Sequence, residues 1–172
     1  MRNLTITMKT LMLITAFLWS AMSMSAQVII TQYYEGSSNN KFIEITNVGS
    51  ASVDLSTYYL GRWSNTDTPS GTASNFSQLS GNIAAGETQV YMNADAAEPA
   101  YAVSNATAST TATYFNGNDP VALTNGSNDW ADRVDCIYST GDWGGETSFY
   151  RNNDVTAGNT SQSVLDGTGE WT

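Results

Sequence analysis

The stretch from residue 28 to residue 49 constrains the fold more than any other part of the chain. Residues 28–34 are rich in β-branched and aromatic side chains, which fit a pleated and partly buried surface. Residues 41–46 alternate with a period of two, as a half-buried strand does. The loop between them, residues 35–40, is polar and contains glycine and paired asparagines, which allow a tight turn. The stretch therefore predicts a β-hairpin.

The second strand of this hairpin has two different faces. We expect Ile43 and Ile45 to point one way, and Phe42 and Glu44 to point the other way. Glu44 is expected to face solvent or to cap a loop.

The remaining chain continues the pattern of short strands and turn clusters, with almost no helical periodicity. One short helical turn is expected around Pro99, and residues 104–113 are expected to form a surface loop. Together these features predict an all-β fold, a two-sheet antiparallel β-sandwich. Further strands are expected at residues 53–55, 58–63, 76–79, 88–92, 114–123, 133–138 and 148–152.

Several segments follow one another in a fixed order: residues 28–47, Val53–Ser56, Tyr59-Leu60, Leu79–Gly81, Ala84–Gly86, Phe115–Asp119, Val121–Leu123, Tyr150-Arg151, Val155–Gly158 and Glu170-Trp171. In this order they resemble the lamin tail domain family in its bacterial secreted form. The resemblance implies that the sandwich is immunoglobulin-like. Because related domains continue beyond a Glu-Trp pair, it also raises the alternative that the last strand is missing or replaced.

The N-terminal segment has the pattern of a secretory signal peptide. Arg2 and Lys9 precede an apolar run at residues 11–19, and small residues lead up to Ala26. The apolar run is too short to span a bilayer, although a retained membrane anchor is the alternative. We therefore expect residues 1–26 to be a signal peptide, residues 27–172 to form the lamin-tail-like domain, and the protein to be secreted or periplasmic. Met8 is an alternative initiator.

Charge limits the classes of partner. The chain carries 16 acidic and 6 basic residues, a net charge of −10. With Arg2 and Lys9 in the leader, four basic residues remain against 16 acidic ones, a net charge of −12. Nucleic acid and anionic membranes are therefore not expected partners. The candidate partner is a cell-surface or polysaccharide ligand.

Residue types also limit the chemistry. The chain has no histidine, which excludes histidine-based triads and most zinc hydrolase designs. Cys136 is the single cysteine, so no intrachain disulfide can form, and its apolar context favours a buried thiol. Paired carboxylates could in principle hydrolyse a glycoside, but no pair carries a distinguishing motif. We therefore expect no enzymatic activity and assign no catalytic residue.

Two turns carry oxygen ligands that suit calcium. The candidate residues are Glu35, Asn116, Asn118 and Asp119. The alternative is that these side chains bond their own backbone, as Asn and Asp in turns commonly do. No cofactor is otherwise expected.

Aromatic residues suggest a second kind of site, a platform for sugar rings formed by Trp63, Trp130 and Trp143 with Tyr58 and Tyr138. Trp130 and Trp143 lie in polar segments, which favours their exposure. The alternative is that these rings pack in the core or at its rim.

Two further interpretations concern charged residues. Asp129, Asp132 and Asp135 are expected to lie on a solvated sheet edge. Arg151 is expected to pair with a neighbouring acid.

These observations, with what the resemblance implies, favour a secreted, non-catalytic binding, adhesion or targeting module. Recognition is expected at the loops formed by residues 35–40, 65–74 and 140–146. The first alternative is a carbohydrate-binding module. The second is an N-terminal accessory fragment of a larger secreted nuclease or phosphatase, since the resemblance implies that such domains accompany these enzymes.

Overall fold

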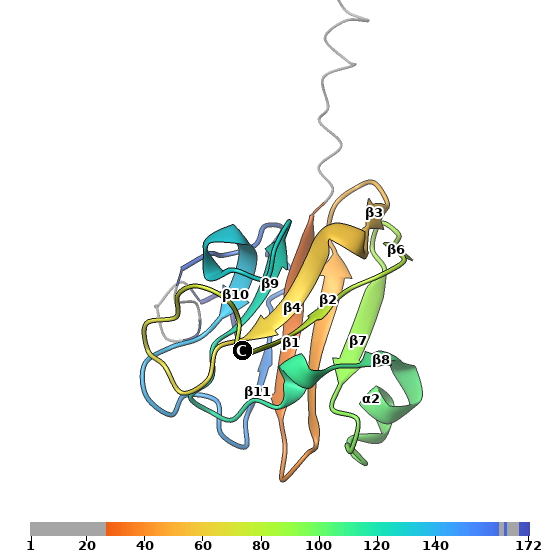
Figure 1. The fold of residues 1–172 in the computed structure, drawn as a ribbon. Coiled ribbons are helices and arrows are strands. Elements are labelled where there is room, and N and C mark those ends of the chain that lie inside the picture. The colour runs from red at the N-terminus through yellow and green to blue at the C-terminus, as the bar shows by residue number, and fades with distance from the viewer. Residues whose placement is uncertain (1–26, 162–163, 165–168) are drawn as a thin grey trace, which may run out of the picture.

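The computed structural model describes residues 27–161, 164 and 169–172. The predicted signal peptide of residues 1–26 lies outside the described residues. The described chain consists mainly of short strands (Figure 1). In chain order the strands are β1 (Val28–Glu35), β2 (Lys41–Asn47), β3 (Val53–Asp54), β4 (Tyr58–Arg62), β5 (Asn75–Gln78), β6 (Asn82–Ile83), β7 (Thr88–Met92), β8 (Ala106–Ser109), β9 (Val121–Asn125), β10 (Arg133–Ile137) and β11 (Ser148–Tyr150). The helices are α2 (Ala100–Asn105) and the single 3₁₀ turns η1 (Leu55–Thr57), η2 (Thr111–Thr113) and η3 (Trp130–Asp132).

Within the described residues the strands form two main sheets. One has the order β11-β1-β2-β7-β8 and is called the β1 sheet; the other has the order β10-β9-β4-β5 and is called the β9 sheet. Strands β3 and β6 pair separately. Buried side chains from both sheets, including Ile30, Ile43, Leu60 and Leu123, form one core cluster between them. The predicted all-β, immunoglobulin-like sandwich is confirmed.

The predicted hairpin forms the centre of the β1 sheet. Strands β1 and β2 pair antiparallel. Ile43 and Ile45 share one face, as expected, and that face is toward the main core. Phe42 lies on the opposite, outer face, where it packs with Met92 and with Ala102 of α2. The outer face of the β1 sheet is therefore partly covered, because α2 lies over one end of it.

The expectation of a surface loop at residues 104–113 is wrong in part. Strand β8 lies in this segment and pairs in parallel with β7, with Val90 opposite Ala106. Its residues are Ala, Thr, Ala and Ser, three of them exposed. Because the segment lacks β-branched apolar alternation, the sequence carries no strand signal there. The β1 sheet is consequently not wholly antiparallel.

The last residues of the chain pair with the edge of the β1 sheet. The backbone N–H of Tyr150 donates to the carbonyl of Thr172 at 2.8 Å, and the N–H of Thr172 donates back at 2.9 Å. Trp171 forms an isolated bridge with Arg151. The β11 edge is therefore covered by the chain itself, which protects it from pairing with another molecule.

Candidate functional site

The predicted aromatic platform does not form on the surface. Trp63 is 3% exposed and Trp130 is 7% exposed, and their rings meet edge to face with centroids 4.9 Å apart. The 3₁₀ turn η3, capped by Asp129, places the Trp130 ring against Trp63, and the guanidinium of Arg133 lies 4.7 Å from its centroid. The expected exposure of Trp130 is therefore wrong, because tertiary packing draws the ring of a polar segment into the interior.

Trp143 is also buried, at 8% exposure, and it belongs to the main core and not to the Trp63 cluster. Its ring centroid lies 5.1 Å from that of Tyr33 and 6.1 Å from that of Phe149. The Trp143 backbone N–H donates to the carbonyl of Gly117 at 2.8 Å, which fixes this loop. Tyr58 is half-buried against the same main core. The structure thus divides the predicted platform residues between two interior clusters.

The loops expected to carry recognition do gather at one end of the sandwich. The backbone N–H of Glu35 donates to Thr147, and the N–H of Gly141 donates to the carboxylate of Asp67. A hollow of about 280 Å³ lies here. It is lined by the predicted calcium ligands Glu35, Asn116 and Asn118, together with Gly117, Asp142, Gly145 and Glu146.

Glu35, the acid contributed to this hollow by β1, already has partners. Its carboxylate pairs with Lys41 at 2.9 Å and accepts a hydrogen bond from the Tyr33 hydroxyl at 2.7 Å. In the part of the chain that the structure describes, no three acidic or cysteine side chains are grouped so that they could hold a metal ion.

Asp119, the fourth predicted calcium ligand, is fully buried and holds the turn together. Its carboxylate pairs with Arg62 at 2.7 Å and accepts from the backbone N–H groups of Asn65 at 2.6 Å and Asn116 at 3.0 Å. These partners match the structural alternative, in which an acidic side chain bonds nearby backbone. Asp119 does not line the hollow that the other three candidates share, and calcium binding stays a prediction.

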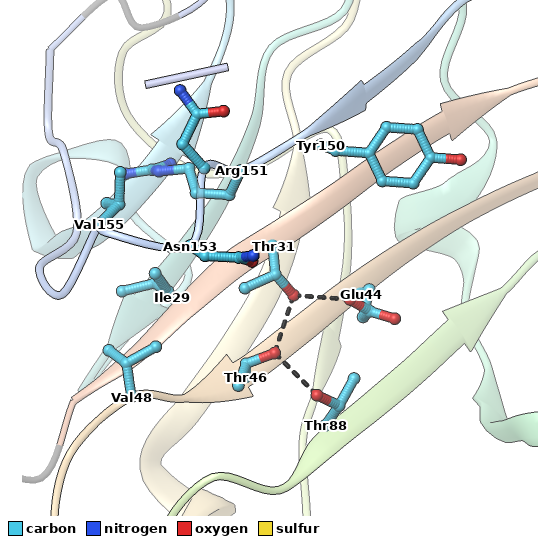
Figure 2. Close-up of a pocket in the computed structure, with 11 residues that line it drawn as sticks. Ile29, Thr31, Glu44, Thr46, Val48, Thr88, Tyr150, Arg151, Asn153 and Val155 are labelled. Carbon is cyan, nitrogen blue, oxygen red and sulfur yellow. Dashed lines mark hydrogen bonds between the residues drawn. The ribbon is translucent and has the colours of Figure 1, made fainter. Parts of the chain in front are cut away.

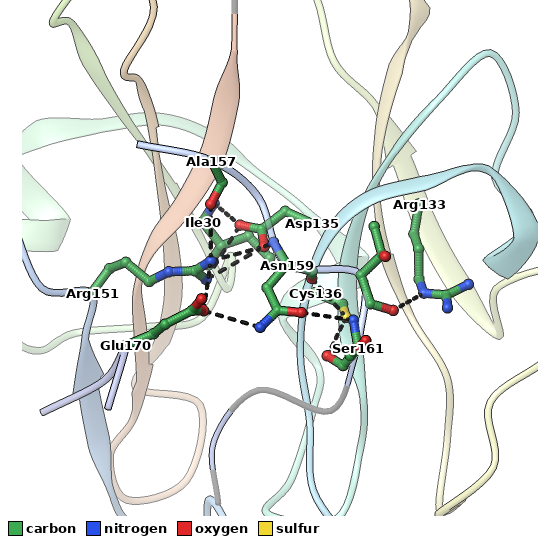
Figure 3. A network of polar contacts seen from close by, with 10 residues as sticks. Ile30, Arg133, Asp135, Cys136, Arg151, Ala157, Asn159, Ser161 and Glu170 are labelled. Carbon is green, nitrogen blue, oxygen red and sulfur yellow. Dashed lines mark hydrogen bonds and ion pairs between the residues drawn. The ribbon is translucent and has the colours of Figure 1, made fainter. Parts of the chain in front are cut away.

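A buried ion pair joins the two sheets and the C-terminal residues (Figure 3). Asp135 of β10 is fully buried and lies 3.3 Å from Arg151, whose side chain is 1% exposed. Asp135 also accepts from the backbone N–H groups of Ile30 and Asn159, both at 2.7 Å. Arg151 further pairs with Glu170 at 3.2 Å. The pairing expected for Arg151 is confirmed, and the solvated position expected for Asp135 is wrong.

Asp135 should titrate near neutral pH. Burial raises the pKa of its carboxyl to about 6, although Arg151 and backbone N–H groups oppose the shift. A carboxyl with a raised pKa binds its proton more tightly in the folded state. Its contribution to stability is therefore complete below about pH 3.8 and is lost as the pH rises through about 6.

We accordingly expect the ¹³C resonance of the Asp135 carboxyl to titrate with a midpoint near 6. Urea unfolding should show the wild type gaining stability relative to Asp135→Asn as the pH falls from above 6 towards 4, since only the wild type takes up this proton. A midpoint below 4 would mean that the ion pair outweighs burial.

The open half of the outer face of the β1 sheet forms a groove of about 380 Å³, called the outer groove (Figure 2). This volume lies within the range of about 300–1,000 Å³ that is typical of small-ligand sites. Its floor carries the side chains of Thr31, Glu44, Thr46 and Thr88 from three adjacent strands. Residues 150–153 and 155 form one wall.

The floor side chains form one continuous hydrogen-bonded row (Figure 2). The Thr31 hydroxyl donates to Glu44 at 2.9 Å, and the hydroxyls of Thr31 and Thr46 are 2.9 Å apart. Those of Thr46 and Thr88 are also 2.9 Å apart. The register of β1 shifts at Thr31, where a β-bulge or irregularity lies between Ile30 and Gln32. Because β1 and β7 both pair with β2, the row crosses all three strands.

Two exposed tyrosines flank Glu44. Tyr101 of α2 is 51% exposed and donates its hydroxyl to Glu44 at 3.1 Å. Tyr150 of β11 is 53% exposed and lines the groove. It stands opposite Gln32, which in turn stands opposite Glu44, so these three residues share one row across the sheet. The outer groove therefore combines the Tyr150 ring with polar groups, as ligand sites commonly do, and Tyr101 lies beside it, bonded to Glu44.

Sequence reasoning found only part of this site. It expected Glu44 to face solvent or to cap a loop, on the face of β2 opposite Ile43 and Ile45. It did not predict that Thr31, Thr88, Tyr101 and Tyr150 would meet there. Their convergence depends on strand order and on the helix α2, which local patterns do not encode.

The fold defines an immunoglobulin-like β-sandwich domain, and the outer groove is the candidate site on it. Residues 21–137 match the family model for the Lamin Tail Domain. The chain belongs to the lamin tail domain family, which is a family of non-enzymatic immunoglobulin-like domains. Searches of the curated proteins and of the solved structures find no match. Among the residues described, no helix has the length and apolar character needed to cross a bilayer.

Proposed function

We propose that the protein is a secreted, non-catalytic binding module that attaches to a cell surface or a polysaccharide through the outer groove. The observation that carries this proposal is the open half of the β1 sheet, where a groove of about 380 Å³ exposes a carboxylate, hydroxyls and a tyrosine ring. Secretion is supported by the signal-peptide pattern of residues 1–26.

The outer groove is a better candidate than the loop end for two reasons. At the loop end Trp143, which was predicted to contact a ligand, is buried, and the carboxylate of Glu35 is already paired with Lys41. On the outer face, by contrast, Tyr101 and Tyr150 are about half exposed. The proposed binding needs no cofactor. The excess of acidic over basic residues disfavours nucleic acid as the partner.

A carbohydrate ligand is supported by one specific observation. Tyr150 and Tyr101 present aromatic surface on either side of the polar Glu44. Amphipathic aromatic rings beside hydrogen-bonding groups suit a sugar, which has both apolar and hydroxylated surface. We therefore propose carbohydrate binding at the outer groove and no longer at the buried tryptophans.

The test is retention of the protein on insoluble polysaccharides and on bacterial cell walls. Thr46→Tyr fills the centre of the outer groove, and Thr107→Tyr makes the same change on exposed β8, away from the groove. We expect the wild type and Thr107→Tyr to be retained, and Thr46→Tyr to lose at least about tenfold in affinity, equivalent to about 1.4 kcal/mol. Undiminished retention of Thr46→Tyr would show that the binding site is not the outer groove. If no surface retained the wild type, the proposed function would be wrong.

A further inference from the structure

We propose that the outer groove takes a polysaccharide bearing free amino groups, with an ammonium group bound at the carboxylate of Glu44. This inference rests on the proposed function and names the chemical class of its ligand. Three features carry it: the uncompensated charge of Glu44, the direction of the hydrogen bonds in the threonine row, and the position of the two tyrosines.

The first feature is charge. Glu44 and Arg151 are the charged residues that line the outer groove. Arg151 is almost fully buried and its charge is paired with Asp135 and Glu170. Glu44 has no ion pair with any described basic residue and receives only neutral hydroxyl donors, from Thr31 and Tyr101. The groove thus presents one uncompensated negative charge, which favours a cationic ligand and repels an anionic one.

The second feature is the direction of the hydrogen bonds. A hydroxyl has a single proton to donate but two lone pairs to accept. The Thr31 proton is used on Glu44, so at the 2.9 Å contact Thr46 must be the donor and Thr31 the acceptor. Thr46 has then used its own proton, so Thr88 must donate to Thr46.

It follows that the row has no hydroxyl proton left for a ligand. Thr31, Thr46, Thr88 and Glu44 can offer a ligand only lone pairs, and the Tyr101 proton is also directed at Glu44. A carboxylate has about four acceptor sites, of which two are used here. The floor of the groove is therefore an acceptor surface, and it suits a ligand rich in donors. An ammonium group supplies three donors and a positive charge, whereas an acetylated amine supplies one donor and no charge.

The third feature is the spacing of the aromatic rings. Tyr150 and Glu44 stand on β11 and β2, with β1 between them, which places their backbones roughly 9–10 Å apart at about 4.8 Å per strand. Tyr101 contacts Glu44 from the other side, from α2. A ligand held at Glu44 can therefore reach the face of a tyrosine through sugar C–H groups or a second ammonium. This arrangement favours an extended chain of amino sugars over a single small amine.

The test is calorimetric titration of the protein at about pH 6, where amines carry their protons. Three probes are compared: a short β-linked glucosamine oligosaccharide, the same oligosaccharide fully N-acetylated, and a lysine peptide of the same charge. We expect the glucosamine oligosaccharide to bind at least about tenfold more tightly than either of the other two. Glu44→Gln should abolish this preference.

The matched control is Glu98→Gln, which removes the same charge from an exposed residue. The Glu98 backbone N–H bonds to Asn40, at the end of the β1–β2 hairpin away from Thr46. This variant should keep the preference, and thermal unfolding should show that both variants fold like the wild type.

The other outcomes separate this inference from the proposed function. Equal affinity for the amine and its acetylated form, or unchanged preference in Glu44→Gln, would overturn the amino-sugar inference but leave a binding module. Equal affinity for the lysine peptide and the glucosamine oligosaccharide would show that the groove recognises amines in general and not a polysaccharide. If neither oligosaccharide binds while the protein is retained on cell walls, the inference alone fails; if no surface retains the protein, the proposed function fails as well.

Discussion

Replacing Arg151 by methionine should lower the free energy of unfolding by about 3–5 kcal/mol, because it leaves a buried charge without its partner. Asp135 is fully buried, and after the change only backbone N–H groups would face its carboxylate. The change also removes the ion pair with Glu170 and the contact of the guanidinium with the Trp171 ring, 4.6 Å from its centroid. Urea unfolding above pH 7 measures the loss.

The pH dependence of this loss distinguishes an orphaned charge from lost packing. Without Arg151, the pKa of Asp135 should rise further above 6, since the guanidinium now lowers it. A protonated Asp135 leaves no charge buried, so the destabilisation should be smaller at about pH 5 than at about pH 8. A loss that is the same at both pH values would show that the ion pair contributes through packing alone.

Two variants control this experiment. Asp135→Asn combined with Arg151→Met removes both charges but keeps one acceptor, so it should cost less than the sum of the single changes. Arg133→Met removes an arginine that covers Trp130 near the surface and is expected to cost only about 1 kcal/mol.

Local sequence patterns were sufficient to predict the central hairpin. The alternation in residues 41–46 and the turn residues at 36–40 depend only on the pleat of a strand and on backbone preferences of glycine and asparagine. The strand at residues 88–92 is confirmed with the same bounds. Strand β8 has no such pattern. Its side chains are small and form no apolar face, and the strand is placed by its parallel pairing with β7.

The buried positions of Asp135 and Trp130 could not be predicted in this way. A charged residue in an edge strand is usually solvated, and a tryptophan in a polar segment is often exposed. Asp135 is buried because Arg151, 16 residues later, and the backbone of Ile30, 105 residues earlier, both reach it. Such distant partners are fixed by strand order, which single-residue patterns do not report.

The outer groove was missed for the same reason. Thr31 and Thr88 are separated by 57 positions in the sequence, and each is an ordinary strand residue on its own. They become part of one row only when β1 and β7 both pair with β2. A candidate site on a sheet face therefore requires knowledge of the sheet order.

Replacing Trp143 by alanine should destabilise the protein by about 3–5 kcal/mol, as expected for removing a large aromatic side chain from a core. The ring packs on Tyr33 and Phe149, and Tyr33 in turn stacks on Phe115 with centroids 4.5 Å apart. Its loss would leave a cavity beside the buried rings of Tyr33 and Phe115 and the partly buried ring of Phe149. Urea and thermal unfolding measure the effect.

Trp143→Phe is the informative comparison. The Trp143 Nε1–H is buried and has no hydrogen-bond partner among the described residues, so removing it costs nothing in hydrogen bonds. We therefore expect less than about half the loss seen for alanine, and retention on polysaccharide equal to that of the wild type. If Trp143→Ala stayed as stable as the wild type yet lost retention, the ring would have to be a ligand contact. Because its partners Tyr33 and Phe149 belong to the interior between the sheets, we expect stability to change and the outer groove to keep its ligand.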